Sequence, residues 1–516
     1  MYFNIIFRLL YISIISLSIT GCGSGAYQNN GDDIAPVITL KGKNPLYLSQ
    51  GGSLVDPGAT ALDREDGDIT TSIVTKNDIN SSKIGSYTIF YDVNDSAGHS
   101  AIRVVRTVIV RDANPPKITL NAYKCSDINW VISQYNSYKE SGAEAIDDID
   151  GNLTSSIIIT VSGGSNLNFV DTSTSGTYNV TYNVKDSAGN SAIPKTRVIK
   201  VISASTKKSG QIVSYDENGN IVSGCSIKDD GYYQIGSIIS YSKKILPDGN
   251  ITITDHTTGL KWSDGAPVRK NWNDANSYCN ALGLDGLTWR LPQMWELLSI
   301  VKKGKIGKAS AIEDIFQRPV SEKADNRAYA WTKTDAPSSK HWTIRINFGG
   351  TDVYDEDSEE LIYCVSGTAT KIAIAPTDRV FTRDATTQIV SEAKSNLDWS
   401  DDNSILSQKI TWEESIAYCD GLTLGGYSDW RLPNINEWYT LSTYDNSASQ
   451  YPNVFVNIVN GEKYWSSTTT EFQPLFTITT TYDYNEVWLY RPSVGADSTS
   501  SSEKSKSRNT ICVRNR

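Results

Sequence analysis

The sequence is poor in the side chains on which many metal centres and acid–base sites depend. Among 516 residues it has two Met and three His, namely His99, His256 and His341. So few imidazoles leave little room for His-based metal binding or catalysis. It also lacks an excess of positive charge, since its net charge is −10. We therefore expect no nucleic-acid partner, because neutralising phosphates requires clustered Lys and Arg.

What is present is typical of a folded, multidomain chain. Hydrophobic residues make up 39% of the sequence, and Tyr (28) and Trp (13) are abundant. This composition favours a packed protein over a disordered one. The length predicts about three to five domains.

The apolar run near the N-terminus is also short. Leu9–Thr20 follows the basic Arg8, and it is too short for a membrane-spanning helix, which needs about 20 residues. It has the form of a secretory signal and ends in I-T-G-C at Cys22, which resembles the lipobox of bacterial lipoproteins. The resemblance implies lipidation of Cys22 and anchorage by two or more acyl chains. We expect a signal peptide at 1–21 and a flexible tether at 22–33.

This interpretation makes the protein an outer-membrane lipoprotein of the cell envelope, surface-exposed or periplasmic. Its membrane partner would be reached through the lipid anchor. The alternative is an ordinary signal peptide, or a short anchor, with a chance Cys.

The next part of the chain contains two repeats of one kind. Asp56–Thr70 (DPGATALDREDGDIT) matches Glu140–Thr154 (ESGAEAIDDIDGNLT). Short alternating strands separated by Asp-Ser-Ala-Gly turns predict all-β sandwiches of the immunoglobulin type. These segments resemble bacterial immunoglobulin-like domains of surface proteins. We place a first sandwich repeat at 34–112 and a second at 113–203, and interpret both as spacers.

Acidic residues are concentrated in the turns of the first sandwich repeat. Asp63, Asp66, Asp68 and Asp95 could supply oxygen ligands to Ca²⁺. The same residue types are also what tight turns require. Both interpretations stay open, and no other cofactor is expected.

The remainder of the chain holds a second, larger kind of repeat built around Trp and Cys. Trp272–Cys279 recurs as Trp412–Cys419, and the W-R-L-P string of Thr288–Pro292 recurs at Asp429–Pro433. The spacing of Trp, Ala and Cys predicts a helix with one apolar face. A second short helix should follow each Leu-Pro, with a capping box that in the second copy joins Asn434 and Glu437. The Arg of W-R-L-P is expected to have a structural role, either pairing with a buried acid or capping a helix.

This combination of motifs resembles the C-terminal domain of the collagen-like adhesin of Legionella, a family widespread in bacterial lipoproteins. The resemblance covers 210–367 and 376–516, which we name the first and second C-terminal repeats. It implies an α+β, C-type-lectin-like fold akin to that of formylglycine-generating enzymes. The cysteines that bracket this domain imply two disulfides, Cys279–Cys364 and Cys419–Cys512.

Two further cysteines are less constrained. Family members open with a segment containing a pair of Cys, but Ser214 stands where the first is expected, so Cys225 loses its neighbour. The remaining Cys125 lies in the second sandwich repeat. Two alternatives stay open for these residues: a Cys125–Cys225 bridge, or two free thiols.

The predicted architecture, an anchor and a stalk bearing lectin-like domains, indicates a ligand-binding or adhesion role toward a glycan or an extracellular protein. A purely structural envelope lipoprotein is the alternative. An enzyme of the formylglycine-generating type is a third interpretation, but it rests on fold analogy. No catalytic constellation is evident in the sequence, so we do not expect an enzyme.

Binding of sulfated polysaccharides, which the resemblance implies, would require a basic patch. The candidates are Lys302, Lys303, Lys305 and Lys308 in the first C-terminal repeat, and Lys504, Lys506, Arg508, Arg514 and Arg516 near the C-terminus. We assign the site to the four residues Lys504, Lys506, Arg508 and Arg514. The alternative is an ordinary solvated face. The repeated Trp residues are expected to form core rather than sugar platforms, because they recur with the motifs.

Overall fold

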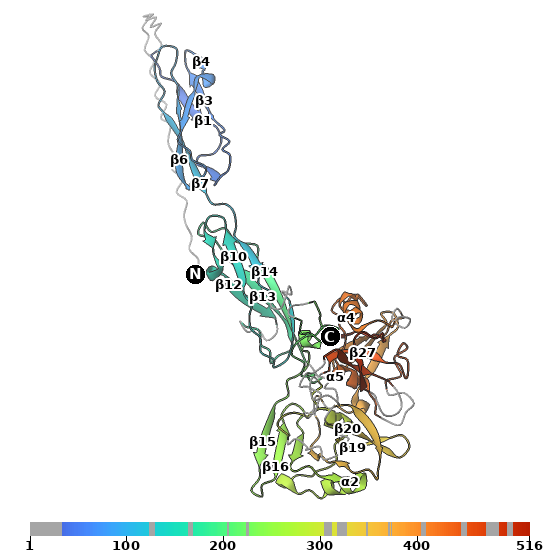
Figure 1. Cartoon of the computed structure of the whole chain (residues 1–516). Coiled ribbons are helices and arrows are strands. Elements are labelled where there is room, and N and C mark those ends of the chain that lie inside the picture. The colour runs from blue at the N-terminus through green and yellow to red at the C-terminus, as the bar shows by residue number, and fades with distance from the viewer. Residues whose placement is uncertain are drawn as a thin grey trace, which may run out of the picture. The chain divides into compact units, whose positions relative to one another are not determined.

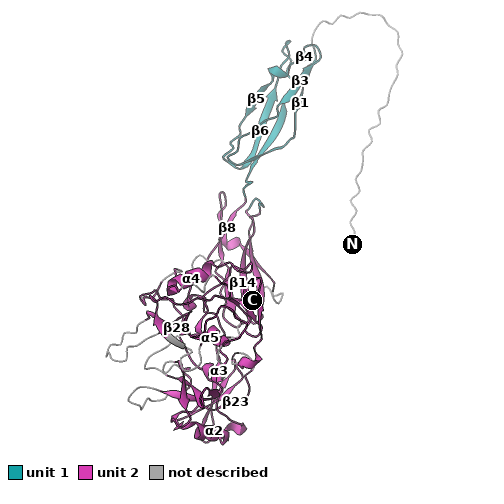
Figure 2. Ribbon diagram, turned by 90° about the vertical axis from the view of Figure 1, so that its right-hand side faces the viewer, with its two compact units in different colours: residues 1–114, 187–190 teal, residues 115–186, 191–516 magenta. Residues whose placement is uncertain are grey.

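The computed structural model describes most of the chain after the predicted signal and tether. The described residues are 33–122, 129–163, 169–203, 206–222, 226–303, 312–316, 328–346, 349–369, 372, 374–403, 409–444, 451–470, 484–492 and 499–516. They form two compact units, residues 1–114 with 187–190 and residues 115–186 with 191–516 (Figure 2). Within the described residues, no helix is long and apolar enough to cross a membrane.

The first sandwich repeat consists of two sheets that share one core (Figure 1). One sheet has the order β1-β3-β4 and the other the order β2-β7-β6-β5. Alternate residues of β7 point inward, as expected for a strand buried on one face. The strands are β1 (Val37–Leu40), β2 (Leu46–Ser49), β3 (Ala59–Asp63), β4 (Gly67–Asp68), β5 (Val74–Asn77), β6 (Gly85–Asp92) and β7 (Val104–Arg111), with the short helix η1 (Thr70–Ser72).

The second sandwich repeat has the same topology. Its sheets have the orders β11-β10-β8 and β12-β13-β14-β9, and β9 pairs parallel with β14 just as β2 does with β7. Its elements are β8 (Lys117–Leu120), β9 (Trp130–Ser133), β10 (Ala143–Asp147), β11 (Gly151–Asn152), η2 (Thr154–Ser156), β12 (Ile158–Gly163), β13 (Gly176–Asn183) and β14 (Lys195–Ile202). The predicted immunoglobulin-type sandwiches are confirmed.

A buried Arg explains why the acidic motif recurs in both sandwich repeats. Arg106 is fully buried, and its Nε lies 3.1 Å from Asp56 Oδ1. The equivalent Arg197 is also fully buried and lies 3.3 Å from Glu140 Oε1. A buried guanidinium requires such a partner. The start of each motif therefore supplies the carboxylate that makes this burial tolerable.

The first C-terminal repeat contains two antiparallel-rich sheets and short helices. The sheet orders are β15-β16-β17-β23 and β18-β22-β19-β20-β21. The elements are β15 (Tyr241–Ile245), β16 (Ile251–Asp255), β17 (Lys261–Asp264), β18 (Arg269–Lys270), α2 (Trp272–Asn280), η3 (Leu284–Gly286), α3 (Met294–Leu298), β19 (Tyr329–Ala336), β20 (Lys340–Arg345), β21 (Thr351–Asp355), β22 (Glu360–Leu361) and β23 (Val365–Ser366).

The second C-terminal repeat follows the same plan. Its sheets have the orders β24-β25-β26-β30 and β27-β28-β29. The elements are η4 (Pro376–Asp378), β24 (Phe381–Asp384), β25 (Ile389–Glu392), β26 (Leu397–Ser400), α4 (Trp412–Gly421), α5 (Ile435–Trp438), η5 (Tyr439–Leu441), β27 (Tyr464–Thr469), β28 (Glu486–Tyr490), β29 (Thr499–Glu503) and β30 (Val513–Asn515). Both C-terminal repeats are rich in strands, in keeping with the α+β prediction.

The helices begin where the sequence predicts them. The Asn271 side chain caps α2 by accepting from the Asp274 amide, and Thr411 with Glu414 forms a capping box at α4. Asn434 and Glu437 form the predicted capping box at α5. Each cap satisfies amides that the first helical turn leaves without partners.

The repeated Trp residues are core, as predicted, with one exception. Trp262, Trp289, Trp399, Trp412 and Trp430 are at most 3% exposed. Trp272 is only half-buried, and its ring stacks on His341 with centroids 3.7 Å apart. Most of the repeated Trp residues therefore lie in the core of their own repeat and do not offer an exposed ring to a sugar.

The Arg of each W-R-L-P string pairs with the acid of the helix that follows, which confirms its predicted structural role. Arg290 donates to both carboxylate oxygens of Glu296 at 2.7 Å. Arg431 makes the same bidentate contact with Glu437, at 2.7 and 2.5 Å. Bidentate pairs of this kind fix geometry as well as charge.

The segment between the second sandwich repeat and β15 packs mainly on the second C-terminal repeat. We name residues 206–222 and 226–236 the covering segment; it contains the short helix α1 (Asp230–Tyr233). Thr468 Oγ1 donates to Asp230 at 2.8 Å, and the Thr469 amide donates to Gln211 at 2.7 Å. Lys504 Nζ donates to the carbonyl of Asp216 at 2.7 Å. The covering segment therefore packs on the second C-terminal repeat, although it precedes the first C-terminal repeat in the sequence.

Candidate ligand-binding site

The cysteines of the C-terminal repeats form two bridges that hold each domain closed. Cys279–Cys364 joins α2 to the end of the domain, and Cys419–Cys512 does the same from α4. Both implied pairings are confirmed. Cys22, Cys125 and Cys225 lie outside the described residues.

The structure does not assemble the four predicted basic residues into one cationic face. Lys504 is 1% exposed, and its Nζ lies 4.3 Å from the ring centroid of Trp412. Arg514 is 6% exposed and bonds to Asp398 at 2.8 Å and Asp429 at 2.6 Å. Nonlocal contacts therefore bury two of the four. Lys504 donates to backbone carbonyls and lies against an aromatic ring, whereas Arg514 pairs with two carboxylates, so neither presents its charge to solvent.

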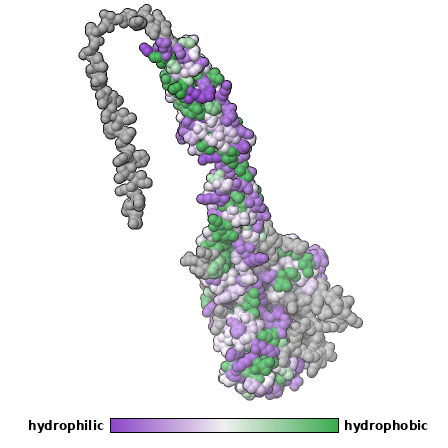
Figure 3. All heavy atoms as spheres, turned by 90° about the vertical axis from the view of Figure 1, so that its left-hand side faces the viewer, coloured by the Kyte–Doolittle hydropathy of each residue, from purple (hydrophilic) through white to green (hydrophobic). Residues whose placement is uncertain are grey.

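The other two candidates are more accessible. Lys506 is exposed and lies 3.4 Å from Glu503, and Arg508 is half-buried and donates to Ser502 at 3.0 Å. Exposed pairs of this kind contribute little to stability. On the face drawn in Figure 3, polar and apolar residues are interspersed over the described surface, as is usual for folded proteins.

The four acidic candidates of the first sandwich repeat serve its turns. Asp63 accepts from the amides of the two residues that close its turn, at 2.8 Å each, and Asp68 accepts from the Thr70 amide at 2.9 Å. Asp66 bonds to Ser96 at 2.6 and 2.8 Å, and Asp95 bonds to the His99 amide at 2.7 Å. Among the described residues, no three of these four bring carboxylate oxygens within 4.8 Å of one another. Calcium binding there stays a prediction.

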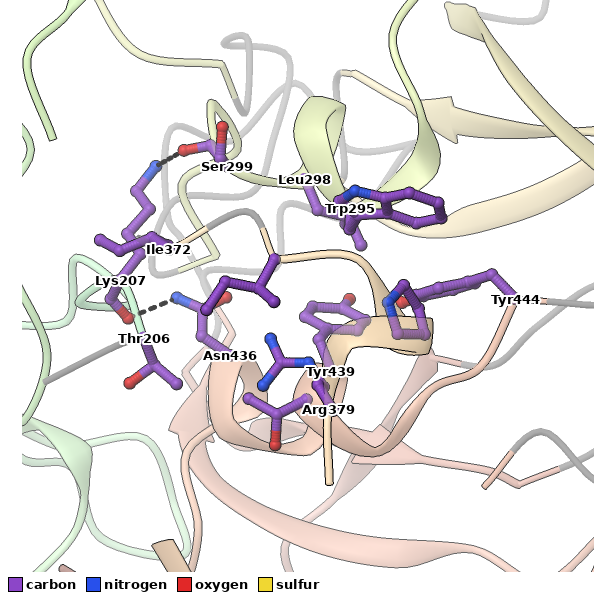
Figure 4. Close-up of a pocket in the computed structure, with 13 residues that line it drawn as sticks. Thr206, Lys207, Trp295, Leu298, Ser299, Ile372, Arg379, Asn436, Tyr439 and Tyr444 are labelled. Carbon is purple, nitrogen blue, oxygen red and sulfur yellow. Dashed lines mark hydrogen bonds between the residues drawn. The ribbon is translucent and has the colours of Figure 1, made fainter. Parts of the chain in front are cut away.

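The two C-terminal repeats meet through equivalent helices, α3 and α5 with η5. Equivalent side chains of the two repeats line one cavity of about 50 Å³ between them (Figure 4). We name it the interface cavity; the equivalent pairs are Trp295 with Asn436, Leu298 with Tyr439, and Ser299 with Thr440.

Contacts beyond the cavity are also exchanged between equivalent positions. Lys303 of the first repeat lies over the Trp488 ring of the second, 4.5 Å from its centroid. At the matching position of the second repeat, Tyr444 lies edge-on to Trp342 of the first, 5.7 Å between centroids. Each repeat thus places one side chain against the Trp at the equivalent position of the other repeat.

The cations of the interface cavity are already satisfied. Lys207 Nζ lies 2.6 Å from Glu313 and donates to the carbonyls of Ser299 and Val301. Arg379 lies 3.4 Å from Glu392. Burial lowers the pKa of both cations. The interface cavity is therefore a joint of mixed polar and apolar lining with little room for a ligand.

A larger cavity lies beside this joint. It has a volume of about 550 Å³ and shares Ile372 and Ile374 with the interface cavity. We name it the junction cleft, because it forms where the second sandwich repeat, the segment after it and both C-terminal repeats come together. Its lining residues are Gln134, Tyr135, Ser203, Ser237, Ile238, Ser240, His256, Thr257, Ala369, Ile372, Ile374, Asp378 and Lys394.

The lining of the junction cleft is mixed in chemistry. It offers hydroxyls, an amide, an imidazole and an aromatic ring beside an Ile-rich wall. His256 Nε2 lies 2.9 Å from Ser242 Oγ, so this ring is already oriented. One acidic residue, Asp378, is balanced by one basic residue, Lys394. A volume between about 300 and 1,000 Å³ with a few convergent polar groups is typical of a small-ligand site.

No motif in the sequence pointed to the junction cleft. Its lining comes from segments between Gln134 and Lys394 that only the tertiary fold brings together. One signal was nonetheless present in the sequence: Tyr135 stands where the first sandwich repeat has Gly51, directly after a Ser-Gln pair that both repeats share.

The comparisons with protein families agree with the two kinds of repeat. A model of the bacterial surface protein Ig-like domain matches residues 38–110 and 126–201. A model of the Lcl C-terminal domain matches residues 251–366 and 388–514. The chain therefore carries two bacterial surface Ig-like domains followed by two Lcl C-terminal domains, which makes it a cell-surface or envelope protein.

The curated relatives share only part of their length with this chain. The pesticidal crystal protein Cry22Aa of Bacillus thuringiensis is 32% identical over 136 residues, 26% of this chain and 17% of that protein. An uncharacterized 81.3 kDa protein of Acholeplasma phage L2 is 27% identical over 199 residues, 38% of this chain and 22% of that protein. The chain thus spans about a fifth of the length of these relatives.

The similarity to solved structures is weak. One is the M60 catalytic domain with the CBM51-1 and CBM51-2 domains of ZmpB from Clostridium perfringens, at 14% identity, 46% of this chain, 38% of that chain and TM-score 0.20. Another is BT4661, a SusE-like surface located polysaccharide binding protein of Bacteroides thetaiotaomicron, at 10% identity, 66% of this chain, 59% of that chain and TM-score 0.14. TM-scores of this size carry no conclusion about function.

Proposed function

We propose that this protein is an envelope lipoprotein that binds an extracellular ligand, a glycan or a protein, and so contributes to adhesion. In this proposal Cys22 carries the lipid anchor and the sandwich repeats act as a stalk. The observation that carries the proposal is the junction cleft, a site-sized cavity built against the paired Lcl C-terminal domains.

The fixed geometry of the paired C-terminal repeats supports a binding role. One disulfide closes each domain, and the exchanged contacts of Lys303 and Tyr444 join the two domains. The covering segment packs on the second of them. A site formed by such elements is organised before its ligand arrives. Preorganisation raises affinity because less conformational entropy is lost on binding.

We do not propose catalysis. A formylglycine-generating type of reaction would need a reactive thiol, and the four described cysteines of the C-terminal repeats are bridged. The joint between the repeats also suits the alternative function, a purely structural envelope lipoprotein.

Binding assays on the mature chain separate these functions. The chain would be produced without its signal and with Cys22→Ser, so that it stays in solution. It would be applied to a glycan array and to immobilised host-matrix proteins. Saturable binding to one ligand class is expected, whereas absence of binding on both surfaces would favour the structural role.

The anchor is tested separately in cells. Cys22→Ser in the full gene should move the protein out of the detergent-soluble membrane fraction, because an acyl-free chain has no lasting membrane affinity. Mass spectrometry of the wild-type N-terminus should show acylated Cys22. Retention of the variant in the membrane fraction would contradict the lipoprotein assignment.

A further inference from the structure

A buried Asp ends one strand in each sandwich repeat. Asp63 ends β3 in the first repeat, and Asp147 ends β10 in the second. Oδ1 of Asp147 accepts from the amides of Ile149 and Asp150 at 2.9 Å each. Oδ1 of Asp63 accepts from the two equivalent amides at 2.8 Å each. The turn that follows each strand therefore explains one carboxylate oxygen of each Asp, but not the other.

The second oxygen of each carboxylate has no hydrogen-bond partner. Oδ2 of Asp147 is buried and accepts no hydrogen bond, and the same holds for Oδ2 of Asp63. Asp147 as a whole is only 5% exposed. A buried carboxylate oxygen without a partner lowers stability, and such an atom in a native structure often marks the place of a water or an ion. Since the same oxygen is left over at equivalent positions of two repeats, it is a feature of the fold and not of one loop.

A second buried carboxylate lies beside Asp147 and comes from a different loop. Asp186 opens the D-S-A-G turn of the second sandwich repeat and is 7% exposed. One carboxylate oxygen of Asp186 lies within 4.8 Å of one of Asp147. Two buried carboxylates this close repel each other unless a cation lies between them. The pair therefore offers a place for a positively charged ligand.

The ligand atoms define the kind of cation. Both are carboxylate oxygens, which suit Ca²⁺ and Mg²⁺, whereas zinc sites are built mainly from Cys and His. Ca²⁺ binds oxygen at about 2.3–2.6 Å, so two oxygens bound to one Ca²⁺ can lie up to roughly 5 Å apart. Ca²⁺ also accepts irregular coordination, whereas Mg²⁺ requires a near-ideal octahedron. A site with two buried side-chain ligands from separate loops thus favours Ca²⁺.

The first sandwich repeat differs at the second carboxylate. There Asp95 takes the place of Asp186, and its Oδ2 lies 3.1 Å from His99 Nδ1. In the second repeat Asn190 occupies the position of His99. No imidazole therefore competes for the carboxylate of Asp186 from that position, and the second repeat is the better candidate for a cation.

We propose that the second sandwich repeat binds one Ca²⁺ through Asp147 and Asp186. Oδ2 of Asp147 and one carboxylate oxygen of Asp186 are direct ligands, and water supplies ligands that the side chains do not, since Ca²⁺ takes six to eight oxygens. The ion neutralises two buried carboxylates, so the repeat is more stable with calcium than without it. This inference concerns the stability of the sandwich repeat and does not depend on the proposed adhesion function.

The test uses the full mature chain carrying Cys22→Ser, freed of metal with EDTA and then dialysed. CaCl₂ and MgCl₂ are the probes. Calorimetric titration should give a dissociation constant for Ca²⁺ of about 0.1–1 mM, as in extracellular calcium modules. Calcium should also raise the unfolding midpoint. Hydrogen exchange followed by mass spectrometry locates the effect: β10 and the turn after it should exchange more slowly with calcium.

The variants separate a lost ligand from a lost turn. Asp147→Asn should weaken the binding of one Ca²⁺ per chain about tenfold or more. The Asn oxygen can still accept from both turn amides, so this variant should be no less stable than the wild type in EDTA. Asp186→Asn should show the same loss of calcium binding. Glu144→Gln is the matched control, because it removes an exposed carboxylate from β10 and should leave calcium binding unchanged.

Four outcomes overturn the proposal. The first is a wild-type chain whose midpoint and hydrogen exchange do not respond to calcium. The second is calcium binding that Asp147→Asn and Asp186→Asn leave as tight as in the wild type. The third is an equal loss of stability in Asp147→Asn with and without calcium, which would assign this residue to the turn alone. The fourth is binding of Mg²⁺ as tight as that of Ca²⁺, which would contradict the choice of ion.

Discussion

The two C-terminal repeats use the same Arg–Glu pair at different depths. In the first, the Arg290 side chain is 29% exposed and also donates to a backbone carbonyl. In the second, the Arg431 side chain is 6% exposed and donates to the amide oxygen of Asn515. The covering segment and the second sandwich repeat both contact the second repeat, for example through Lys200. The same Arg–Glu pair is therefore expected to contribute differently to the free energy of unfolding in the two repeats, because the second pair is more deeply buried.

The largest expected effect tests what the repeats share. Cys279→Ala/Cys364→Ala and Cys419→Ala/Cys512→Ala should each lower the free energy of unfolding by about 4–5 kcal/mol in the chain-entropy model. The two losses should be alike, because the sequence separations are 85 and 93 residues. Urea unfolding followed by Trp fluorescence measures both. Markedly unequal losses would show that one bridge stores strain or constrains a less open unfolded state.

The next prediction tests the difference between the two C-terminal repeats in the burial of their Arg–Glu pairs. Glu437→Ala should lower stability by about 3 kcal/mol or more, because it leaves a buried guanidinium without its partner. Glu296→Ala should have a smaller effect, since water can reach Arg290. Both variants are compared by urea unfolding at one pH. Equal losses would remove burial as the explanation of the difference.

A third prediction concerns the covering segment itself. Burial raises the pKa of Asp230 to about 7 and that of Asp229 to about 6. An Asp in the unfolded chain titrates near 3.9, so the folded chain holds more protons between these values. Stability should therefore fall as pH rises from about 4 to 7.

Asp230→Asn should flatten this fall, because the amide stays neutral. Unfolding free energies of the variant and the wild type, measured at pH 4.5 and 8, give the comparison. The exposed Asp357→Asn serves as the control and should follow the wild-type profile. A variant profile as steep as the wild type would mean that Asp230 does not carry the dependence.

The smallest expected effect lies at the joint between the repeats. Burial lowers the pKa of Lys303 well below its ordinary value, so the unfolded chain binds a proton that the folded chain does not. Stability should rise with pH between the lowered value and about 10.4. Lys303→Met should abolish that rise and leave the protein unchanged or about 1 kcal/mol more stable.

The matched variant for this test is Lys302→Met, at the neighbouring residue whose side chain pairs with Glu313 and Asp314. It should keep the pH-dependent rise. Unfolding at pH 7 and 9.5 measures both variants. Loss of stability in Lys303→Met would instead show that the contact of its ammonium with Trp488 outweighs the desolvation of the charge.

The sequence revealed those features that depend on short spacing or on repetition. The helix at Trp272 and the capping box at Asn434 were predictable, because neighbouring residues specify them. The bridge of each C-terminal repeat was predictable only through the resemblance to a known family. The carboxylate that pairs with Arg106 was visible as a motif, although its buried partner was not.

Nonlocal packing hid the rest. The sequence predicts Lys504 to be a surface cation. Its ammonium instead donates to backbone carbonyls that lie almost 290 positions earlier in the chain. The junction cleft escaped prediction for the same reason, since its walls come from four parts of the chain. Composition and spacing carry no information about such contacts.

The exchange of Lys303 and Tyr444 across the joint has a further consequence. Contacts in which equivalent positions trade places are those of a two-fold symmetric homodimer. Here both partners lie on one chain, so their association is intramolecular and takes place at an effective concentration of the order of millimolar. The pair therefore stays assembled at any dilution, and a single chain reproduces the arrangement of a two-fold symmetric dimer.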